Sequence, residues 1–366
     1  MRNRPGIAVL AALAAAGSLS VPRATGAQDR VEDDGRAFTL LPIVAYAPET
    51  GVVLAGYGLY YFRMPGSRLE SRASHVSVAA GYTTRNQYGV ELRPDLYFDD
   101  ERWIATADLT LRDLPTELFG VGNDTRLRDR ERYELGLAGV ATELSRRVLP
   151  HFYVGLRQDA EHADVSAVEP DGMLAAQRVP GAAGGWISGV GLVVRYDDRD
   201  KILDARAGGL YELAVTRYDD VLGSDHQFTR VDVDLRKFHT VLDRSGVAVQ
   251  LLLQLTSGDP PFTAMPELGG PNLLRGIYGG RYRDANLVAL QTEYRFPLAG
   301  PLGGAVFAGA GSVASAPAGL AGARPHGAAG AGLRVLLDRA ERVRLRLDGA
   351  LSQDDFGFYL TVGEAF

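Results

Sequence analysis

Arg342-Val343-Arg344-Leu345-Arg346-Leu347-Asp348 is a run in which charged and apolar residues alternate without exception. Successive side chains of a β-strand point to opposite faces, so this run predicts a strand with one apolar and one charged face. A helix would mix the two kinds of residue around its circumference. The same alternation recurs in residues 228–238 and, with Leu252 as the exception, in residues 246–256.

Segments of this kind fill the chain after residue 37, and we predict sixteen of them. Most reach the roughly 9–11 residues that a membrane-spanning strand needs. An even number of strands also lets both ends of a barrel wall lie on one side of a membrane. The predicted strands are 38–47, 51–63, 73–83, 87–98, 101–112, 130–144, 150–163, 183–196, 209–218, 226–239, 245–256, 284–297, 303–313, 326–338, 342–350 and 355–366.

Two architectures explain such alternation. In a soluble sandwich the apolar faces meet a second sheet, whereas in a membrane barrel they meet lipid and the polar faces line a lumen. The number of strands, their length and the aromatic residue at Phe366 favour the barrel. We therefore predict an all-β fold, a 16-stranded antiparallel transmembrane β-barrel that fills residues 38–366 as one domain. A soluble two-sheet protein stays as the alternative.

The composition limits the classes of function. Of 366 residues, 23% are charged and 46% are apolar, which excludes a disordered chain. The formal net charge of −6 disfavours a nucleic-acid-binding protein. A mean hydropathy of −0.06 is too low for a bundle of membrane helices but suits a barrel. Without cysteine, the chain has neither disulfides nor thiolate metal sites.

The first 27 residues have the pattern of a cleaved secretory signal. Arg2 and Arg4 precede a short apolar run, Ile7 to Leu19, and Thr25-Gly26-Ala27 offers small residues for cleavage. A short membrane anchor is the other interpretation, but the run is too short to span comfortably. Residues 28–37 then form a short periplasmic segment. We expect export to the outer membrane of a bacterium.

Three predicted connections are long, at 113–129, 164–182 and 257–283, and long loops in a compact domain usually carry function. Catalytic motifs are missing from the sequence. It contains no Gly-x-Ser-x-Gly elbow, no His-Glu-x-x-His pair and no phosphate loop of the Walker type. We therefore expect neither an enzyme nor a bound cofactor or metal.

The third long connection carries a resemblance to a known family. Its sequence Leu268-Gly269-Gly270-Pro271-Asn272-Leu273-Leu274-Arg275-Gly276-Ile277-Tyr278, together with residues 281–284 and 291–298, resembles the BamA/TamA family of the bacterial surface antigen superfamily. The hallmark of that family is an Arg-Gly-aromatic motif in the sixth extracellular loop, which folds back into the barrel. Residues 42–56, 196–200, 330–334 and 358–366 are similar to other parts of the family pattern, so the resemblance covers about residues 38–366.

The resemblance implies a function. Relatives insert, translocate or assemble outer-membrane proteins or lipids, and their first and last strands form a weak seam that opens laterally. Here the seam would lie between residues 38–47 and 356–366. An exposed strand edge of this kind can template the strands of a client. A passive pore or a structural barrel that has lost this activity is the alternative.

The sequence departs from the family pattern in two informative ways. Family members usually carry soluble POTRA domains before the barrel, and the few residues between the predicted signal and the first strand leave no room for one. A Phe-x-Asp-x-Gly pattern is common on the thirteenth strand. Here that run is Phe307-Ala308-Gly309-Ala310-Gly311, so glycine stands where the acid is expected to hold the loop arginine.

The candidate site follows from the loop motif, which comprises Gly269, Gly270, Arg275, Gly276 and Tyr278. An arginine in a narrow lumen keeps its charge and needs an acid. Glu293 shares the parity of Gln291 and Arg295, so it faces the lumen, and the family pattern pairs it with the loop arginine. Asp348, Asp232 and Asp234 are the other expected partners. The alternatives are an exposed loop charge at Arg275, or a pair that only stiffens the barrel.

Further expectations concern the loop glycines, the lumen and the partners. Gly269, Gly270, Gly276, Gly279 and Gly280 should permit turns with positive φ. The expected lumenal charges either neutralise their acidic neighbours or support ion conduction; they are Arg230, Arg236, Arg295, Arg342, Arg344 and Arg346. The resemblance makes Phe366 part of the signal read by the barrel-assembly machinery. Outer-membrane lipid and a protein or lipid client are the expected partners of a monomer that binds no nucleic acid.

Overall fold

The structure of the protein is a computed structural model that describes residues 37–366 except 48–50, 69–70, 243–244, 340 and 354. The predicted signal at 1–27 and nearly all of the predicted segment at 28–37 therefore lie outside the described residues. In the described part of the chain, no helix is both long enough and apolar enough to cross a membrane.

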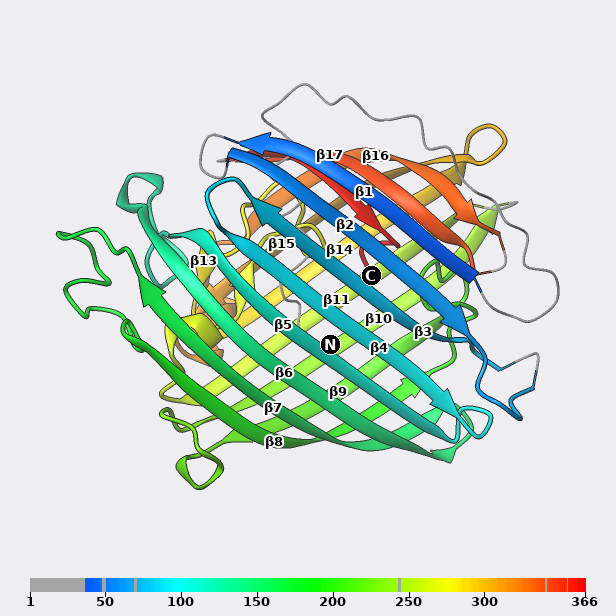
Figure 1. The fold of residues 1–366 in the computed structure, drawn as a ribbon, viewed down its shortest axis with the longest axis horizontal. Helices are drawn as coiled ribbons and strands as arrows, with labels where there is room; N and C mark the ends of the chain where they lie inside the picture. Colours follow the sequence, from blue (N-terminus) through cyan, green and yellow to red (C-terminus); the bar gives the residue numbers. More distant parts are fainter. Residues whose placement is uncertain (1–36, 48–50, 69–70, 243–244, 340, 354) are drawn as a thin grey trace.

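Sixteen strands form one antiparallel sheet in which each strand pairs with the next in the chain (Figure 1). The exception is that β14 follows β11, because β12 (Glu267–Leu268) and β13 (Tyr282–Arg283) pair with each other in the intervening loop. The predicted all-β, sixteen-stranded fold is confirmed. The strands of the large sheet are β1 (Ala37–Ala47), β2 (Gly51–Phe62), β3 (Ser74–Thr83), β4 (Tyr88–Phe98), β5 (Trp103–Leu118), β6 (Glu131–Leu149), β7 (Phe152–Ser166), β8 (Gly184–Asp197), β9 (Gly208–Tyr218), β10 (Phe228–Leu242), β11 (Ser245–Gly258), β14 (Asn286–Pro297), β15 (Leu302–Ala314), β16 (His326–Asp338), β17 (Val343–Ser352) and β18 (Phe356–Val362).

The sheet curls so that its two ends approach each other (Figure 1). Leu59 and Tyr61 of β2 share a buried cluster with Val343 of β17, and Val362 of β18 packs against the same cluster. Within the described residues, however, no strand pairing joins β1 to β18. The two ends of the wall therefore meet through side chains at a seam without a hydrogen-bonded ladder.

Burial on the wall is the reverse of that in a water-soluble sandwich. On β9, Leu213 is 44% exposed, whereas its neighbour Glu212 is 4% exposed. Val215 is likewise exposed and Thr216 is buried, so the alternation runs along the strand. Apolar side chains that point outward along a barrel wall indicate that lipid surrounds the barrel. Polar side chains that point inward indicate a polar lumen.

Three strand boundaries differ from the sequence prediction by four residues or more. Strand β5 runs on to Leu118, because residues 113–118 pair with residues 131–136 as a hairpin above the wall. The first long connection is therefore only 119–130. Strand β6 runs on to Leu149 at the opposite end, where Arg147 and Leu149 pair with Tyr153 and Phe152 of β7. Strand β18 ends at Val362 instead of residue 366. Strand β17 begins at Val343 instead of residue 342. Val343 is buried beside Leu59 and Tyr61 of β2, so the first apolar residue of the alternating run does not face outward.

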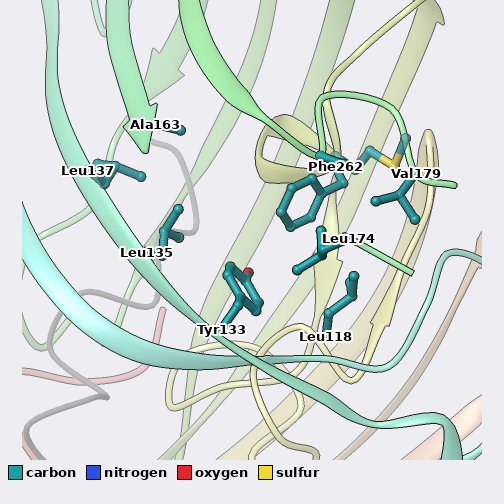
Figure 2. Packing of buried hydrophobic residues seen from close by; sticks show 10 residues of the cluster. Leu118, Tyr133, Leu135, Leu137, Ala163, Leu174, Val179 and Phe262 are labelled. Atoms are coloured by element: carbon teal, nitrogen blue, oxygen red, sulfur yellow. The ribbon is translucent and has the colours of Figure 1, made fainter. Parts of the chain in front are cut away.

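The two ends of the barrel differ. The three longest connections, 119–130, 167–183 and 259–285, all lie at one end, which we call the long-loop end. There a buried apolar cluster joins Leu118 and Tyr133 with Leu174 and with Phe262, which come from all three connections or the strands beside them (Figure 2). The opposite, short-turn end has connections such as 298–301. The apolar cluster covers the lumen at the long-loop end.

Candidate functional site

Residues 259–285, between β11 and β14, form the loop that fills the lumen, and we call them the lid loop. Its tip is buried: Leu273, Leu274 and Ile277 share an apolar cluster with residues of β11, β14, β15 and β16. The short β12–β13 pair closes the loop above this tip. The chain therefore turns back into the barrel before it starts β14.

Arg275 is the central residue of the lid loop and is almost completely buried. Its Nη2 donates to Glu293 of β14, and its Nη1 donates to Asp348 of β17 at 2.5 Å. Its guanidinium carbon also lies 3.4 Å from the ring centroid of Phe307 on β15, a cation–π arrangement. Arg275 thus links the loop to three strands of the wall.

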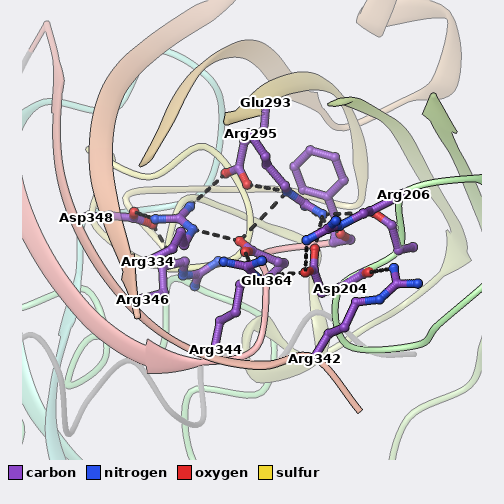
Figure 3. Close-up of polar contacts among 12 residues, drawn as sticks. Asp204, Arg206, Glu293, Arg295, Arg334, Arg342, Arg344, Arg346, Asp348 and Glu364 are labelled. Carbon is purple, nitrogen blue, oxygen red and sulfur yellow. Dashed lines mark hydrogen bonds and ion pairs between the residues drawn. The ribbon is translucent and has the colours of Figure 1, made fainter. Parts of the chain in front are cut away.

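A network of arginines surrounds the two acids that bind Arg275 (Figure 3). Arg334 of β16 donates to Asp348 at 2.5 Å and to Glu364 at 2.8 Å, and its Nη2 lies 3.3 Å from Glu293. Arg295 donates to Glu293 at 2.7 Å. Because buried charges are costly unless they are paired, the network fixes each member in place once it has formed.

Arg346 of β17 holds the backbone of the lid loop as well as its acid. Its Nη2 donates to the carbonyl of Pro271 and to Asn272 Oδ1, both at 3.0 Å. Its Nε lies 3.3 Å from Asp348. Glu293 and Asp348 therefore hold the lid loop through Arg275, and Arg346 holds it a second time through oxygens of the loop itself.

The glycine after Arg275 lets the loop run against the last strands. Gly276 has φ +104°, and a Cβ there would lie 2.8 Å from the backbone nitrogen of Leu351 in β17. Its N–H donates to the hydroxyl of Tyr359 in β18 at 3.0 Å. Positive φ also occurs at Gly269, Gly270 and Gly280, as predicted, whereas the prediction for Gly279 was wrong.

The glycine at the family's acid position also has a structural reason. A Cβ on Gly309 would lie 2.5 Å from Leu274 Cδ2 and 2.7 Å from the carbonyl oxygen of Leu290. The tip of the lid loop thus occupies the space that an aspartate would need. In this chain Asp348, two strands further on, provides a carboxylate to Arg275.

The other two expected partners of Arg275 bind elsewhere, so that prediction was wrong. Asp232 accepts a hydrogen bond from Gln254, and Asp234 accepts from Arg236 and Gln250. Both lie on β10, whereas the acids at Arg275 come from β14 and β17. Parity gave the face of each side chain but not its height in the barrel.

The remaining predicted charges lie at different levels of the lumen. Arg230 donates to the carbonyl of Ala264 in the lid loop, and Arg344 donates to Asp204 at 2.8 Å. Arg342 lies in the turn before β17 at the rim, not on the strand, and donates to Asp200 at 2.8 Å. Burial raises the pKa of Asp200, but the N–H of Arg206 and the side chain of Arg342 outweigh it and hold that pKa below its usual value.

Tyr278, the aromatic residue of the loop motif, lies near the long-loop end and is 36% exposed. Its ring packs edge-to-face on Phe119 at a centroid distance of 5.7 Å. Arg275 and Tyr278 therefore act at different places: the arginine in the charge network, the tyrosine where the lid loop meets the neighbouring loop.

Two members of the network were not singled out from the sequence, Arg334 and Glu364. Arg334 could have been found by parity, because Arg334, Leu333 and Val335 alternate in a predicted strand. A second lumenal cluster was also missed, in which Arg195 donates to Glu212 at 2.6 Å and to Glu143 at 2.7 Å. For Glu364 the signal was misleading, since the predicted strand 355–366 gives it the parity of Phe356 and Phe358, which face outward.

A family model decides where this chain belongs: residues 70–366 match the Omp85 superfamily domain. The chain is a member of the Omp85 superfamily. No curated protein sequence matches it. Omp85 domains of this type are outer-membrane barrels, so the lumen described above is that of an outer-membrane barrel. By the usual arrangement of such barrels, the long-loop end is extracellular and the short-turn end is periplasmic.

Solved structures agree with the Omp85 fold at low sequence identity. BamA from Haemophilus ducreyi lacking POTRA domains 1–3 is similar, with a TM-score of 0.57 and 14% identity over 90% of this chain and 70% of that one. CdiB from Escherichia coli has a TM-score of 0.56 and 15% identity over 89% of this chain. CdiB from Acinetobacter baumannii has a TM-score of 0.55 and 12% identity over 90%. This chain spans 61% and 60% of the two CdiB chains.

The last four residues of this Omp85 barrel turn into the lumen. The backbone leaves the wall at Gly363, which has φ +83°. Phe366 is buried in a cluster with Ala205, Phe238 and Ala248, and its backbone oxygen accepts from Arg295 at 3.1 Å. Its ring therefore faces the interior of the barrel rather than lipid, which explains why the predicted closing strand was too long.

Because Phe366 is buried, we expect it to stabilise the folded barrel, in addition to any role in assembly. We expect Phe366→Leu to lower the free energy of unfolding by about 1 kcal/mol, because a smaller side chain fills the cluster less well. Urea unfolding of the barrel refolded in detergent measures this. Phe358→Leu on β18, an exposed position, is the control and should leave the midpoint unchanged. Equal midpoints for wild type and Phe366→Leu would contradict the packing role.

Proposed function

We propose that this Omp85 barrel assists the insertion, translocation or assembly of outer-membrane proteins or lipids through the seam between β1 and β18. The observation that carries the proposal is the missing ladder between these two strands within the described residues. Backbone groups without partners are costly in hydrocarbon, so such an edge favours pairing with a strand of a client.

The lengths of the two strands support a weak seam. β18 has 7 residues and β1 has 11, so β18 is too short to pair with β1 over its whole length. Residue pairs from Leu345–Val362 to Leu351–Phe356 join β18 to β17. This ladder has fewer residue pairs than any other between neighbouring strands in the described part of the barrel. Separating β18 from β17 therefore breaks fewer residue pairs than separating any other two neighbouring strands in the described part of the barrel.

The lid loop is connected to β18, which borders the seam, and to its neighbour β17. Arg275 binds Asp348 on β17, and the N–H of Gly276 binds Tyr359 on β18. A movement of β18 must therefore break or carry along a contact with the loop. Two interpretations of Arg275 remain in this proposal: the pair either stiffens a fixed barrel or acts as a gate that responds to the seam.

The proposal includes how the chain reaches its place. Residues 1–27 act as a cleaved signal, 28–37 form a short periplasmic segment, and the barrel-assembly machinery inserts the barrel, reading Phe366 as part of its signal. The barrel works as a monomer, without an enzymatic step, among outer-membrane lipids. A separate periplasmic partner recruits the client if no POTRA domain does so.

A passive pore is the second candidate, and one cavity favours it. A cavity of 230 Å³ lies beside Asn272 of the lid loop and is lined by charged residues that include Arg93, Asp108 and Arg157. Charged lumen walls support ion conduction. Against a wide pore stand the lid loop in the lumen and the apolar cluster at the extracellular mouth.

Locking the seam tests the proposal, and the lack of cysteine in the chain makes the experiment clean. Cysteine pairs are scanned with one residue in 38–43 and the other in 356–362. A pair that forms a disulfide should abolish the acceleration of client folding in liposomes, and reduction should restore it. Val193→Cys with Ala214→Cys, which face each other in β8 and β9, is the matched control.

Two results separate the candidates. Client folding that is insensitive to a complete seam disulfide contradicts lateral opening. Stepwise conductance in planar bilayers without any effect on client folding favours the passive pore.

A further inference from the structure

A second cavity lies at the periplasmic end of the lumen and shares Arg295, Arg334 and Glu364 with the lid-loop network. Its volume is 360 Å³, and we call it the periplasmic cavity. It is bounded by the turn before β9, the start of β11, the turn between β14 and β15, and the facing ends of β16 and β17. Glu364, which follows β18, also lines it. Figure 3 shows several of the side chains that point into this region.

The lining of the periplasmic cavity is strongly basic. The described residues that line it include two acids, Asp204 and Glu364, and six arginines: Arg206, Arg295, Arg334, Arg339, Arg342 and Arg344. Arginine does not lose its charge in proteins, so this excess is permanent at every physiological pH. A compact basic cavity of this kind attracts anions from the periplasm.

The two acids are already shared among the arginines. Asp204 lies 2.8 Å from Arg344, 3.5 Å from Arg206 and 3.9 Å from Arg295. Glu364 lies 2.8 Å from Arg334, 3.8 Å from Arg295 and 4.0 Å from Arg344. Acids outside the lining also take part: Asp200 binds Arg342, Glu293 binds Arg295, and Asp348 binds Arg334. Glu293 and Asp348 are shared with Arg275, and Asp348 with Arg346 as well. Five carboxylates therefore face eight guanidinium groups, so positive charge is left over even where ion pairs exist.

Two arginines offer donors for a ligand. Arg334 is 1% exposed, and its Nη2 makes no hydrogen bond, with only Glu293 at an ion-pair distance of 3.3 Å. Arg339 stands at the mouth of the cavity, and within the described part of the chain it has neither an ion pair nor a hydrogen bond. Arg339 therefore offers free guanidinium donors to an anion, and the charge of Arg334 adds to the positive field of the cavity.

We propose that the periplasmic cavity binds a phosphate group, carried either by a phospholipid headgroup of the inner leaflet or by a free phosphate. Guanidinium groups match phosphate oxygens in bidentate geometry. Basic pockets at the edge of a membrane protein also recognise lipid headgroups. Phe296, Leu302 and Leu336 line the same cavity and offer apolar contacts to the glycerol end of a lipid. This site does not depend on the proposed seam activity.

A bound phosphate would tie together parts of the barrel that are far apart in sequence. It would lie between Arg206 before β9, Arg334 of β16 and Arg344 of β17, beside Glu364. Its binding would therefore hold the periplasmic ends of the strands next to β18. We expect ligand binding to raise the temperature at which the folded band is lost in heat-modifiability gels.

The test is calorimetry on the purified full-length barrel in a non-ionic detergent, with inorganic phosphate and with dihexanoyl-phosphatidylglycerol as probes. The binding variant is Arg206→Gln with Arg339→Gln, because neither arginine has a contact closer than 3.5 Å to an acid of the cavity. We expect saturable binding that weakens at least tenfold in this variant. The matched control, Arg128→Gln with Arg217→Gln, removes the same charge at the extracellular end and should change affinity less than twofold.

The two probes distinguish the source of the phosphate. Binding of inorganic phosphate with the lipid's affinity indicates a free-phosphate site, and preference for the lipid indicates a headgroup site; both support the proposal. A lack of saturable binding by either probe to the wild-type barrel overturns it. Equal weakening in the binding variant and the control also overturns it, because the effect is then one of net charge.

Discussion

Arg275→Ala is expected to lower the free energy of unfolding of the barrel by about 3–5 kcal/mol, the usual cost of leaving a buried charge without its partner. Glu293 and Asp348 are both fully buried and lose their contact from the lid loop. Arg334 and Arg346 remain near them, but neither lies on the lid loop. The loop then loses its ionic contacts through Arg275, while the packing of its apolar tip and the hydrogen bonds from Arg346 and to Tyr359 remain.

Urea unfolding of the refolded barrel measures this loss, and planar-bilayer conductance reports release of the lid loop from the lumen. Arg217→Ala is the matched control, since Arg217 is an exposed arginine that pairs with Asp219. Surface ion pairs contribute about 0–1 kcal/mol. Arg275→Lys should be intermediate, because an ammonium cannot bridge two carboxylates with a planar fork. Equal stability of Arg275→Ala and wild type would show that the network does not hold the loop.

Gly309→Asp, which restores the family's acid, should destabilise this barrel rather than strengthen it. The new Cβ would lie 2.5 Å from Leu274 Cδ2, 2.7 Å from the Leu290 oxygen and 2.8 Å from Gln291 Cβ. Overpacking of this kind costs about 1–3 kcal/mol, and the added carboxylate lies in a buried region. We expect the tip of the lid loop to be displaced from its position against β15.

Limited proteolysis of the lid loop and urea unfolding check this outcome. Gly309→Ala separates the effect of size from that of charge, and it should keep the steric part of the loss. Gly322→Asp in the β15–β16 loop is the control, because a Cβ added at Gly322 would have no neighbouring atom within 4 Å. A Gly309→Asp barrel that is as stable as wild type, with a protected loop, would mean that Leu274 does not occupy this space.

The wall of the barrel was readable from the sequence because every spanning strand must satisfy the same constraint. Lipid on one side and a polar lumen on the other impose a period of two on each strand. The parity of Glu293 therefore predicted its lumenal direction, and the loop motif directed attention to Arg275. The strand extension at Leu118 was missed because the hairpin above the membrane no longer needs an apolar face.

The arrangement inside the lumen was not readable in the same way. Parity says that Asp232, Asp234 and Asp348 all face inward, but the tilt of the strands decides which one reaches Arg275. The inward turn at Gly363 also depends on tertiary contacts of Glu364 and Phe366 with distant strands. Such contacts leave no period in the sequence.

The most direct test of the whole account is chemical labelling of Leu274→Cys in intact cells with a membrane-impermeant maleimide. Leu274 is 2% exposed at the tip of the lid loop, whereas Val221, in the extracellular loop before β10, is 86% exposed. The account predicts rapid labelling of Val221→Cys and protection of Leu274→Cys, with protection lost when Arg275→Ala is added. Labelling of Leu274→Cys as rapid as that of Val221→Cys, with Arg275 intact, would contradict a lid loop locked in the lumen.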